Sequence, residues 1–309
     1  MKIVFNLIDV GLADNGGTKT LVKCAETFVS FGHRVTMVSN FRNSYRWQRI
    51  SSTVQFVRCS SVPDCDLVIA TGFLSVPTTV RAKSRYKCYY IRGFELWRAT
   101  KKALLRSYKS LPCIVNSQWL LSLLKIYKIN VNLVYPGLDF DNFVNLKSQR
   151  DNNVGAIFSK KHKTKLHVFA QNVARSTGYS LLMLNKDNTG RTPDEVNKFY
   201  NQIKVWVSPS ELEGLHNCPM EASLAGCGLV VTDHPRSGTQ DYSIHEKTAL
   251  VYPAGDIKTA SEYVRLLITN DTLRKNMNES MVEVLREKIG DRKSNMKRFI
   301  EISTGSKNA

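Results

Sequence analysis

The chain has 309 residues, 42% of them hydrophobic and 23% charged, and its formal net charge is +18. This length and balance are typical of a two-domain globular protein and exclude a low-complexity or collagen-like chain. No apolar run approaches the length of about 18 residues that a membrane-spanning helix requires, so we expect none.

Residues 3–7 form an apolar run that predicts the first strand, and the polar residues that interrupt it argue against a signal peptide. A loop containing Gly16 and Gly17 follows, and a helical pattern then runs to Phe31. Glycines between a strand and a helix let backbone amides approach an anion closely. Gly16 and Gly17 are therefore candidate phosphate-binding residues, and an ordinary tight turn is the alternative.

The rest of the first half alternates strands and helices, which is typical of a parallel sheet covered by helices. Ser117 is expected to cap the helix predicted at residues 117–128. Strands are predicted at residues 35–39, 53–58, 66–70, 86–92, 113–116 and 131–135, and helices at residues 96–108 and 117–128.

Positive charge is concentrated in residues 1–150, which contain 22 Lys and Arg residues against 8 Asp and Glu residues, a net charge of +14. Such a half is predicted to attract nucleic acid, an anionic membrane surface or an acidic glycan. A basic face that is merely solvated is the alternative. The candidate polyanion-binding residues are Arg81, Lys83, Arg85, Lys87, Arg92, Arg98, Lys101 and Lys102.

The seven cysteines are scattered and never occur as Cys-x-x-Cys, which favours reduced thiols, a cytoplasmic location and no zinc site. Asp139 and Asp141 form an Asp-x-Asp sequence of the kind that can hold a cation. We prefer to interpret residues 136–143 as a connection between domains, because that also explains Pro136 and Gly137. No metal is predicted.

In the second half, strands are predicted at residues 154–158, 180–185, 205–207 and 229–232, and helices at residues 194–200, 260–267, 272–285 and 296–302. Residues 159–165 form a lysine-rich turn. A short helix is expected between Val207 and Leu229, with Asn217 or Cys218 as its cap and Gly226 where it ends.

Glu213 precedes this short helix and Glu221 is expected in its first turn, so both carboxylates should lie at the C-terminal edge of a parallel sheet, where α/β sheets bind ligands. Carboxylates accept charge-assisted hydrogen bonds from sugar hydroxyls. The amides of Gly214, Leu215, His216 and Asn217, with the positive end of the helix dipole, suit a diphosphate. Alternatively, Glu221 only complements the dipole and Glu213 is only a solvated charge.

These residues also carry a resemblance. Pro209-Ser210, Glu213-Gly214, Glu221-Ala222 and Ala225-Gly226-x-x-Leu229-Val230-Val231-Thr232 occur in this order, and further blocks begin at Gly238 and Ala249. The chain thus resembles the family 4 glycosyltransferases with their Glu-x7-Glu signature. The resemblance implies the GT-B fold, in which two Rossmann-like domains face each other across a cleft. The domains would be residues 1–137 and 138–289, with a last helix at about residues 290–305 packed back on the first.

The resemblance implies that Glu221 binds the ribose hydroxyls of a nucleotide-sugar donor and Glu213 a hydroxyl of the transferred sugar. It also places Gly16 and Gly17 near the donor. Ala156 stands where the family has an arginine, so Lys161, Lys163 or Lys165 would supply charge to the diphosphate, with Lys163 preferred. The reaction would retain the anomeric configuration without a metal or other cofactor.

The first domain would bind the acceptor, for which a glycan or lipid head group at an anionic membrane is the preferred class. The protein would then be cytoplasmic and associate peripherally with a membrane. A hydroxylated base in DNA is the alternative acceptor. A hypothesis of another class is a nucleic-acid-binding protein on a decayed GT-B scaffold, since the usual arginine is missing at Ala156.

Overall fold

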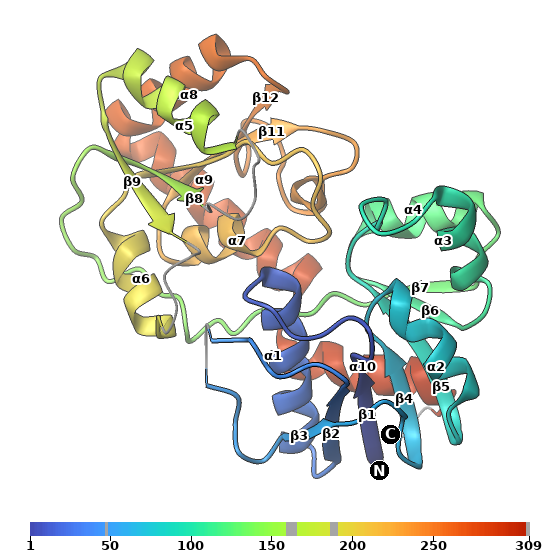
Figure 1. Cartoon of the computed structure of the whole chain (residues 1–309). Helices are drawn as coiled ribbons and strands as arrows, with labels where there is room; N and C mark the ends of the chain where they lie inside the picture. The colour runs from blue at the N-terminus through green and yellow to red at the C-terminus, as the bar shows by residue number, and fades with distance from the viewer. Residues whose placement is uncertain (47–48, 159–165, 186–190, 307–309) are drawn as a thin grey trace. The chain divides into compact units, whose positions relative to one another are not determined.

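The computed structural model describes residues 1–46, 49–158, 166–185 and 191–306, and the chain divides into two compact units (Figure 1). Unit 1 comprises residues 1–137 and the C-terminal segment from Asp291, and unit 2 comprises residues 138–290. Each unit contains one parallel sheet with helices on its faces. The predicted α/β class with two parallel-sheet domains is therefore confirmed.

Among the described residues, the sheet of unit 1 has seven strands in the order β3-β2-β1-β4-β5-β6-β7, all paired in parallel. Its strands are β1 (Lys2–Asn6), β2 (Arg34–Ser39), β3 (Gln55–Arg58), β4 (Cys65–Ala70), β5 (Ser84–Ile91), β6 (Cys113–Val115) and β7 (Val131–Leu133). Its helices are α1 (Gly16–Ser30), α2 (Val76–Arg81), α3 (Lys101–Tyr108), α4 (Gln118–Ile126) and α10 (Arg292–Thr304).

Alternation of side chains along these strands divides the core of unit 1 between the two faces of the sheet. On one face, Phe5 stacks on Phe28 of α1 at 5.8 Å between ring centroids, and Phe28 lies 5.8 Å from Phe299 of α10. On the other face, Tyr89 lies 5.6 Å from Tyr108 of α3. Helices α1 and α10 thus bury one face, and α3 helps to bury the opposite one.

The structure corrects two details predicted for unit 1. The helix expected over residues 96–108 begins only at Lys101, because Thr100 caps it by accepting a hydrogen bond from the Ala103 amide at 3.3 Å. Before it, the Glu95 carbonyl accepts hydrogen bonds from the amides of Arg98 and Ala99 in a turn. Ser117 does occupy the cap position of α4, but its hydroxyl makes no capping bond.

The sheet of unit 2 has the order β12-β11-β10-β8-β9 among the described residues, again in parallel. Its strands are β8 (Asn153–Phe158), β9 (Ser180–Asn185), β10 (Val205–Ser208), β11 (Gly228–Asp233) and β12 (Leu250–Pro253). Its helices are α5 (Leu166–Thr177), α6 (Pro193–Asn201), α7 (Asn217–Leu224), α8 (Ile257–Thr269) and α9 (Asp271–Val284). The sequence pattern did not predict α5 or β12.

Unit 2 also buries both faces of its sheet. Val205 and Val207 of β10 pack with Val173 of α5 and Val264 of α8 in one cluster. Trp206, between the two valines, points to the other face and lies 5.4 Å from Tyr200 of α6 between ring centroids. The strand is therefore hydrophobic at each position, as parallel strands covered on both faces are.

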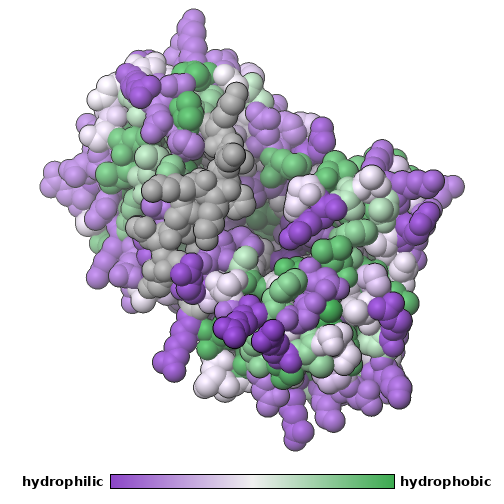
Figure 2. All heavy atoms as spheres, viewed as in Figure 1, coloured by the Kyte–Doolittle hydropathy of each residue, from purple (hydrophilic) through white to green (hydrophobic). Residues whose placement is uncertain are grey.

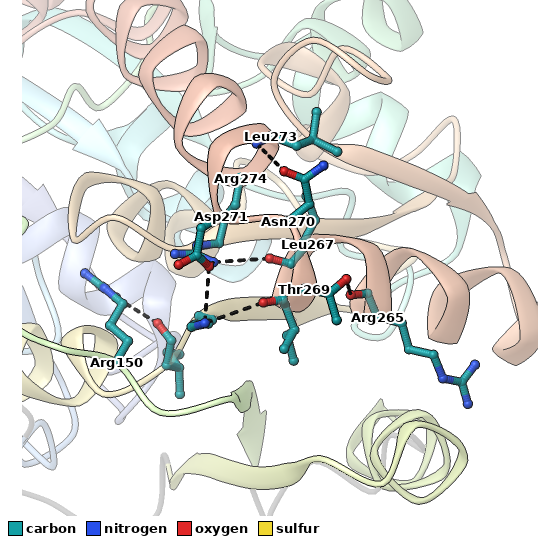
Figure 3. A network of polar contacts seen from close by, with 11 residues as sticks. Arg150, Arg265, Leu267, Thr269, Asn270, Asp271, Leu273 and Arg274 are labelled. Carbon is teal, nitrogen blue, oxygen red and sulfur yellow. Dashed lines mark hydrogen bonds and ion pairs between the residues drawn. The ribbon is translucent and has the colours of Figure 1, made fainter.

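The junction of α8 and α9 is held by a polar network (Figure 3). Asp271 in the first turn of α9 accepts hydrogen bonds from Arg274 Nη1 at 2.5 Å and Lys204 Nζ at 3.2 Å. The hydrogen bond from Arg274, with a smaller contribution from Lys204, lowers the pKa of Asp271. Asn270 caps α9 through a hydrogen bond from the Leu273 amide at 2.9 Å. This network lies at the start of β11, away from the strand ends considered next.

Candidate functional site

The strand order of unit 2 reverses between β8 and β10. From β8 the chain passes through α5 to β9 on one side, whereas from β10 it passes through α7 to β11 on the other. Ligands of open α/β sheets bind at the carboxyl ends of the strands beside such a reversal. The loop of residues 209–216 and the N-terminus of α7 follow β10 directly. The predicted carboxylates therefore belong to the part of unit 2 where a ligand is expected.

Glu221 is the more enclosed carboxylate, since only 7% of the residue is exposed. Its Oε2 accepts a hydrogen bond from the hydroxyl of Tyr200 at 3.4 Å. Burial, with the nearby Cys218 and Glu221, raises the pKa of Tyr200 well above its usual value, so this hydroxyl stays protonated and donates. Glu221 is thus a carboxylate fixed within the unit.

The helix containing Glu221 begins differently from the prediction. His216, rather than Asn217 or Cys218, is its N-cap residue, so Glu221 is the fifth helical residue and lies beyond the first turn. The stabilisation of a carboxylate by a helix dipole falls off within that turn. A role limited to complementing the dipole therefore explains Glu221 poorly.

His216 is held through both its ring and its backbone carbonyl. Its Nδ1 lies 3.0 Å from the hydroxyl of Ser208 at the end of β10, and its carbonyl accepts a hydrogen bond from Tyr242 Oη at 2.8 Å. The residue is 5% exposed. These contacts fix the start of α7 against the end of β10. The sequence pattern did not identify Ser208 or Tyr242, because neither stands next to His216 in the chain.

Glu213 is half-buried and lies on a loop that is tied to a second loop. Its Oε1 accepts a hydrogen bond from the hydroxyl of Ser210 at 2.8 Å. Its backbone pairs with Ser237, and the Gly238 amide donates to its carbonyl at 3.3 Å. The Ser-x-x-Glu spacing was visible in the sequence, whereas the contact with residues 236–238 comes only from the fold.

The two loops approach each other so closely that only glycine fits at position 238. A β-carbon there would lie 1.9 Å from the carbonyl oxygen of Gly214. We expect Gly238→Ala to separate the loops, to destabilise unit 2 by about 1–3 kcal/mol and to weaken binding of any ligand that these loops hold. Gln240→Ala, an exposed change nearby, should do neither. Chemical unfolding and ligand titration measure the two effects, and equal results for the two variants would argue against this contact.

The lysines predicted to grip a diphosphate, Lys161, Lys163 and Lys165, lie outside the described residues, between the end of β8 and the start of α5. Ala156 in β8 is 1% exposed. An arginine at this position would have to place a guanidinium in the packed interior of unit 2. The absence of the family's arginine at this position therefore agrees with the local packing.

In unit 1, Gly16 and Gly17 form the first turn of α1, which Asn15 caps by accepting a hydrogen bond from the Thr18 amide at 2.8 Å. A β-carbon at Gly16 would meet nothing within 4 Å, whereas one at Gly17 would lie 2.8 Å from Nη1 of Arg92. The small size of Gly17 therefore accommodates an arginine of its own unit. The sequence pattern had suggested a different reason for the glycines, the close approach of backbone amides to a phosphate.

The predicted polyanion-binding residues do not form one group. They divide between the two ends of β5, whose eight residues span about 26 Å at about 3.3 Å per residue. Arg81, Lys83, Arg85 and Lys87 lie around its start, and Arg98, Lys101 and Lys102 lie in the chain beyond its end, all exposed except the half-buried Lys87. Arg92 is separate from both, because it is partly buried and its Nη2 donates to the Thr71 carbonyl at 2.5 Å.

Within the described part of the chain, no group of three or more His, Cys, Asp or Glu side chains is placed to hold a metal ion. The Asp-x-Asp segment lies at the boundary of the two units, where Leu138 donates a backbone hydrogen bond to Gly290 at 3.0 Å. Phe140, between the two aspartates, packs 4.5 Å from the guanidinium of Arg286. These contacts agree with a connecting segment.

Comparison with known proteins finds a family model that matches part of unit 2. Residues 183–283 match the family model described as glycosyl transferases group 1. The capsular polysaccharide biosynthesis glycosyltransferase CapM of Staphylococcus aureus is 30% identical over 76 residues, which cover 25% of this chain and 20% of CapM. The match therefore spans about a fifth of that relative's length. The similarity to group 1 glycosyltransferases that the family model describes thus lies within unit 2.

Two solved structures resemble the whole chain. The sucrose-phosphate synthase of Thermosynechococcus elongatus has a TM-score of 0.78 at 12% identity, with 98% of each chain covered. HepE of Anabaena, solved with UDP-glucose, has a TM-score of 0.77 at 11% identity, with 99% of this chain and 100% of HepE covered. These likenesses show that the fold is GT-B.

Proposed function

We propose that the protein is a glycosyltransferase that moves a sugar from a nucleotide-sugar donor, a UDP- or GDP-sugar, to an anionic acceptor. The observation that carries the proposal is the pair Glu213 and Glu221 around the start of α7, at the strand reversal of unit 2. The match to the group 1 family lies in the same unit, and HepE, with the same fold, was solved with UDP-glucose.

In this proposal Glu221 accepts hydrogen bonds from the ribose hydroxyls, and Glu213 accepts one from the transferred sugar. The first amides of α7, with the dipole of that helix, face the diphosphate. Lys163, or its neighbours Lys161 and Lys165, adds positive charge. These assignments, like membership of family 4, are part of the proposal.

The chemistry breaks the bond between the sugar's anomeric carbon and the diphosphate oxygen and forms a bond to an acceptor hydroxyl. Negative charge develops on the departing diphosphate, so preorganised positive charge lowers the barrier. We propose that amides and lysines provide this charge without a metal. The acceptor's proton passes to a phosphate oxygen of the donor, and the anomeric configuration is retained.

Unit 1 would supply the acceptor site, and its surface favours an anionic membrane. Trp97 is 65% exposed and Ile126 is 74% exposed. Lys101 Nζ lies 4.8 Å from the ring of Tyr127, which brings the start of α3, just beyond Trp97, beside the end of α4 at Ile126. Apolar side chains beside lysines suit the boundary of an anionic bilayer. Figure 2 shows one face of the molecule, on which hydrophobic and hydrophilic residues are interspersed.

Among the residues that the structure describes, no helix combines the length and hydropathy of a membrane span. On the strength of the exposed Trp97 and Ile126, we propose peripheral attachment from the cytoplasmic side. The double variant Trp97→Ser, Ile126→Ser should bind vesicles that contain anionic lipid about tenfold or more weakly, because it removes two side chains that enter the bilayer boundary. Leu266→Ser, which removes an exposed apolar residue of unit 2, should bind as the unmodified protein does.

Flotation at two salt concentrations measures this binding. Equal flotation of the double variant and the control would exclude this surface as the attachment site. Duplex DNA with a hydroxymethylated base is tested beside the vesicles, because DNA glycosylation is the alternative acceptor chemistry. Tight, strongly salt-dependent DNA binding without flotation would favour that alternative.

The proposal of an enzyme is tested separately. Purified protein is incubated with a panel of UDP- and GDP-sugars, and release of the nucleoside diphosphate is measured. A donor at about 100 times its Kd should also stabilise the protein by about 2.7 kcal/mol. If no donor is turned over or stabilises the protein, and the protein binds nucleic acid, the result would favour a nucleic-acid-binding protein on a GT-B scaffold.

A further inference from the structure

One half of unit 1 has almost no acidic side chains. Residues 67–137, which run from within β4 to the boundary with unit 2, contain twelve Lys and Arg residues and one acidic residue, Glu95. Glu95 Oε2 accepts hydrogen bonds from the Phe73 amide at 2.6 Å and from Tyr89 Oη at 2.9 Å. This carboxylate joins the chain after β4 to β5 and the chain after it. The positive charge of this half is therefore almost uncompensated.

Helix α3 presents a row of these cations to the solvent. Lys102, Arg106 and Lys109, the last at the C-cap, follow one another at intervals of four and three positions, so they lie on one face of the helix. All three are exposed, whereas Leu104 and Tyr108 are buried in the core. At a rise of 1.5 Å per residue, the row is about 10 Å long. The sequence analysis had not singled out Arg106 or Lys109.

The end of α4 adds two further cations. Lys101 Nζ lies 4.8 Å from the ring of Tyr127, which places Lys125 and Lys128 beside the start of α3. Both lysines are exposed. In the described part of the chain, neither they nor the three cations of the row form an ion pair with an acidic side chain. Five exposed cations without acidic partners therefore gather around α3.

The basic group at the start of β5 has a different environment. Cys65 of β4 pairs with Ser84 of β5, so the residues that follow them, Asp66 and Arg85, lie at the same level of neighbouring strands. Asp64 precedes β4 directly. Acidic neighbours reduce the attraction of a basic surface for an anion. Of the two basic groups of unit 1, the one on α3 is therefore better suited to an anionic ligand.

We infer that the outer face of α3, with the end of α4, binds a linear anionic polysaccharide. A row of cations fits a chain whose anionic groups repeat, because a single head group would meet only one or two of them. No exposed apolar side chain lies between Lys102 and Lys109, so this face does not suit insertion into a bilayer. Tyr108, the one aromatic residue in that stretch, is buried and cannot stack on the bases of a nucleic-acid strand.

The identity of the polymer rests on the proposed function, since an enzyme that extends a glycan must hold the glycan. Helix α3 follows β5, so it begins near the edge of the sheet where ligands of α/β proteins bind, and it leads away from that edge. An acceptor chain that ends at this edge would continue along α3. The acceptor would then be an anionic glycan chain rather than a lipid head group alone.

Isothermal titration of the full chain with a heparin dodecasaccharide, without any donor, tests this inference. The double variant Arg106→Gln, Lys109→Gln should bind the dodecasaccharide about tenfold or more weakly, because two charge-assisted contacts are lost. The control Arg81→Gln, Lys83→Gln removes the same charge from the chain before β5 and should change the affinity less than about twofold. Equal weakening by the two double variants would mean general charge attraction and would overturn the inference.

The length of the ligand provides a second test. A heparin disaccharide reaches only one or two cations of the row, so it should bind at least about tenfold more weakly than the dodecasaccharide. Equal affinities for the two lengths would contradict a binding surface that extends along α3. Glutamine is a good helix former and the replaced side chains are exposed, so all variants should keep the melting temperature of the unmodified protein.

Competing partners are tested with the same variants. If duplex DNA binds more tightly than the dodecasaccharide and is weakened by Arg106→Gln, Lys109→Gln, the face binds nucleic acid and the inference is wrong. If this double variant lowers only the flotation of vesicles that contain anionic lipid, the face belongs to the membrane surface and the inference is again wrong.

The design separates this inference from the proposed function. Because no donor is present, the polysaccharide surface can be found even if the protein transfers no sugar. Turnover of a nucleotide sugar by a protein that binds no oligosaccharide would overturn the inference and leave the proposed function standing.

Discussion

Glu221→Ala is expected to raise the KM for the nucleotide-sugar donor by about ten- to a hundredfold, with a smaller change in kcat. A hydrogen bond from a donor hydroxyl to a carboxylate contributes about 1.5–3 kcal/mol, and each factor of ten corresponds to about 1.4 kcal/mol. Glu221 should bind the ribose in the ground state and the transition state alike, so its loss appears mainly in KM. Steady-state kinetics at varied donor concentration measure both KM and kcat.

Two further variants decide whether the effect belongs to the carboxylate. Glu221→Gln preserves the shape of the side chain and an acceptor for Tyr200, so it should fold normally and still raise the donor KM. Glu211→Ala removes an exposed carboxylate from the same loop and should leave the donor KM unchanged. Unaltered kinetics in a folded Glu221→Gln protein would remove the ribose role from Glu221.

Arg150→Ala is expected to destabilise unit 2 by about 3–4 kcal/mol, the largest stability effect we predict. The Arg150 guanidinium joins the C-terminal ends of α6 and α7. Nη1 donates to the carbonyls of Tyr200 at 2.9 Å and Ile203 at 2.7 Å. Nη2 donates to Asn201 Oδ1 at 2.9 Å and to the Ala225 carbonyl. Alanine would remove these four hydrogen bonds and a cation that favours both helix ends.

Arg265→Ala is the matched control, and Figure 3 shows both arginines. Arg265 is exposed on α8 and donates to one carbonyl, that of Ser176, so its loss should cost at most about 1 kcal/mol. Urea unfolding is followed by tryptophan fluorescence in proteins whose other tryptophans, Trp47, Trp97 and Trp119, are replaced by phenylalanine, so that the signal comes from Trp206 in the core of unit 2. Equal urea concentrations at the unfolding midpoint for the two variants would show that Arg150 does not hold the two helix ends together.

The sequence by itself determined the class of fold and the order of most elements. Apolar runs such as residues 205–207 and 229–232 predicted buried parallel strands, because a strand covered on both faces is hydrophobic at every position. Gly226 correctly predicted the end of α7, since the helix stops at Leu224. The spacing of Glu213 and Glu221 also comes from the chain itself, because one loop and one short helix carry both.

The tertiary structure alone decided which distant residues meet. No local pattern indicates that Gly17 must be small for Arg92, or that Gly214 and Gly238 touch, since 75 and 24 positions separate these pairs in the numbering. Charge counting placed eight basic residues in one group, whereas β5 holds its two ends apart and Arg92 packs, partly buried, against Gly17 and Thr71. Composition gives the number of charged side chains in a segment. Only the packing of strands and loops determines which of them are exposed to solvent and which lie against other residues.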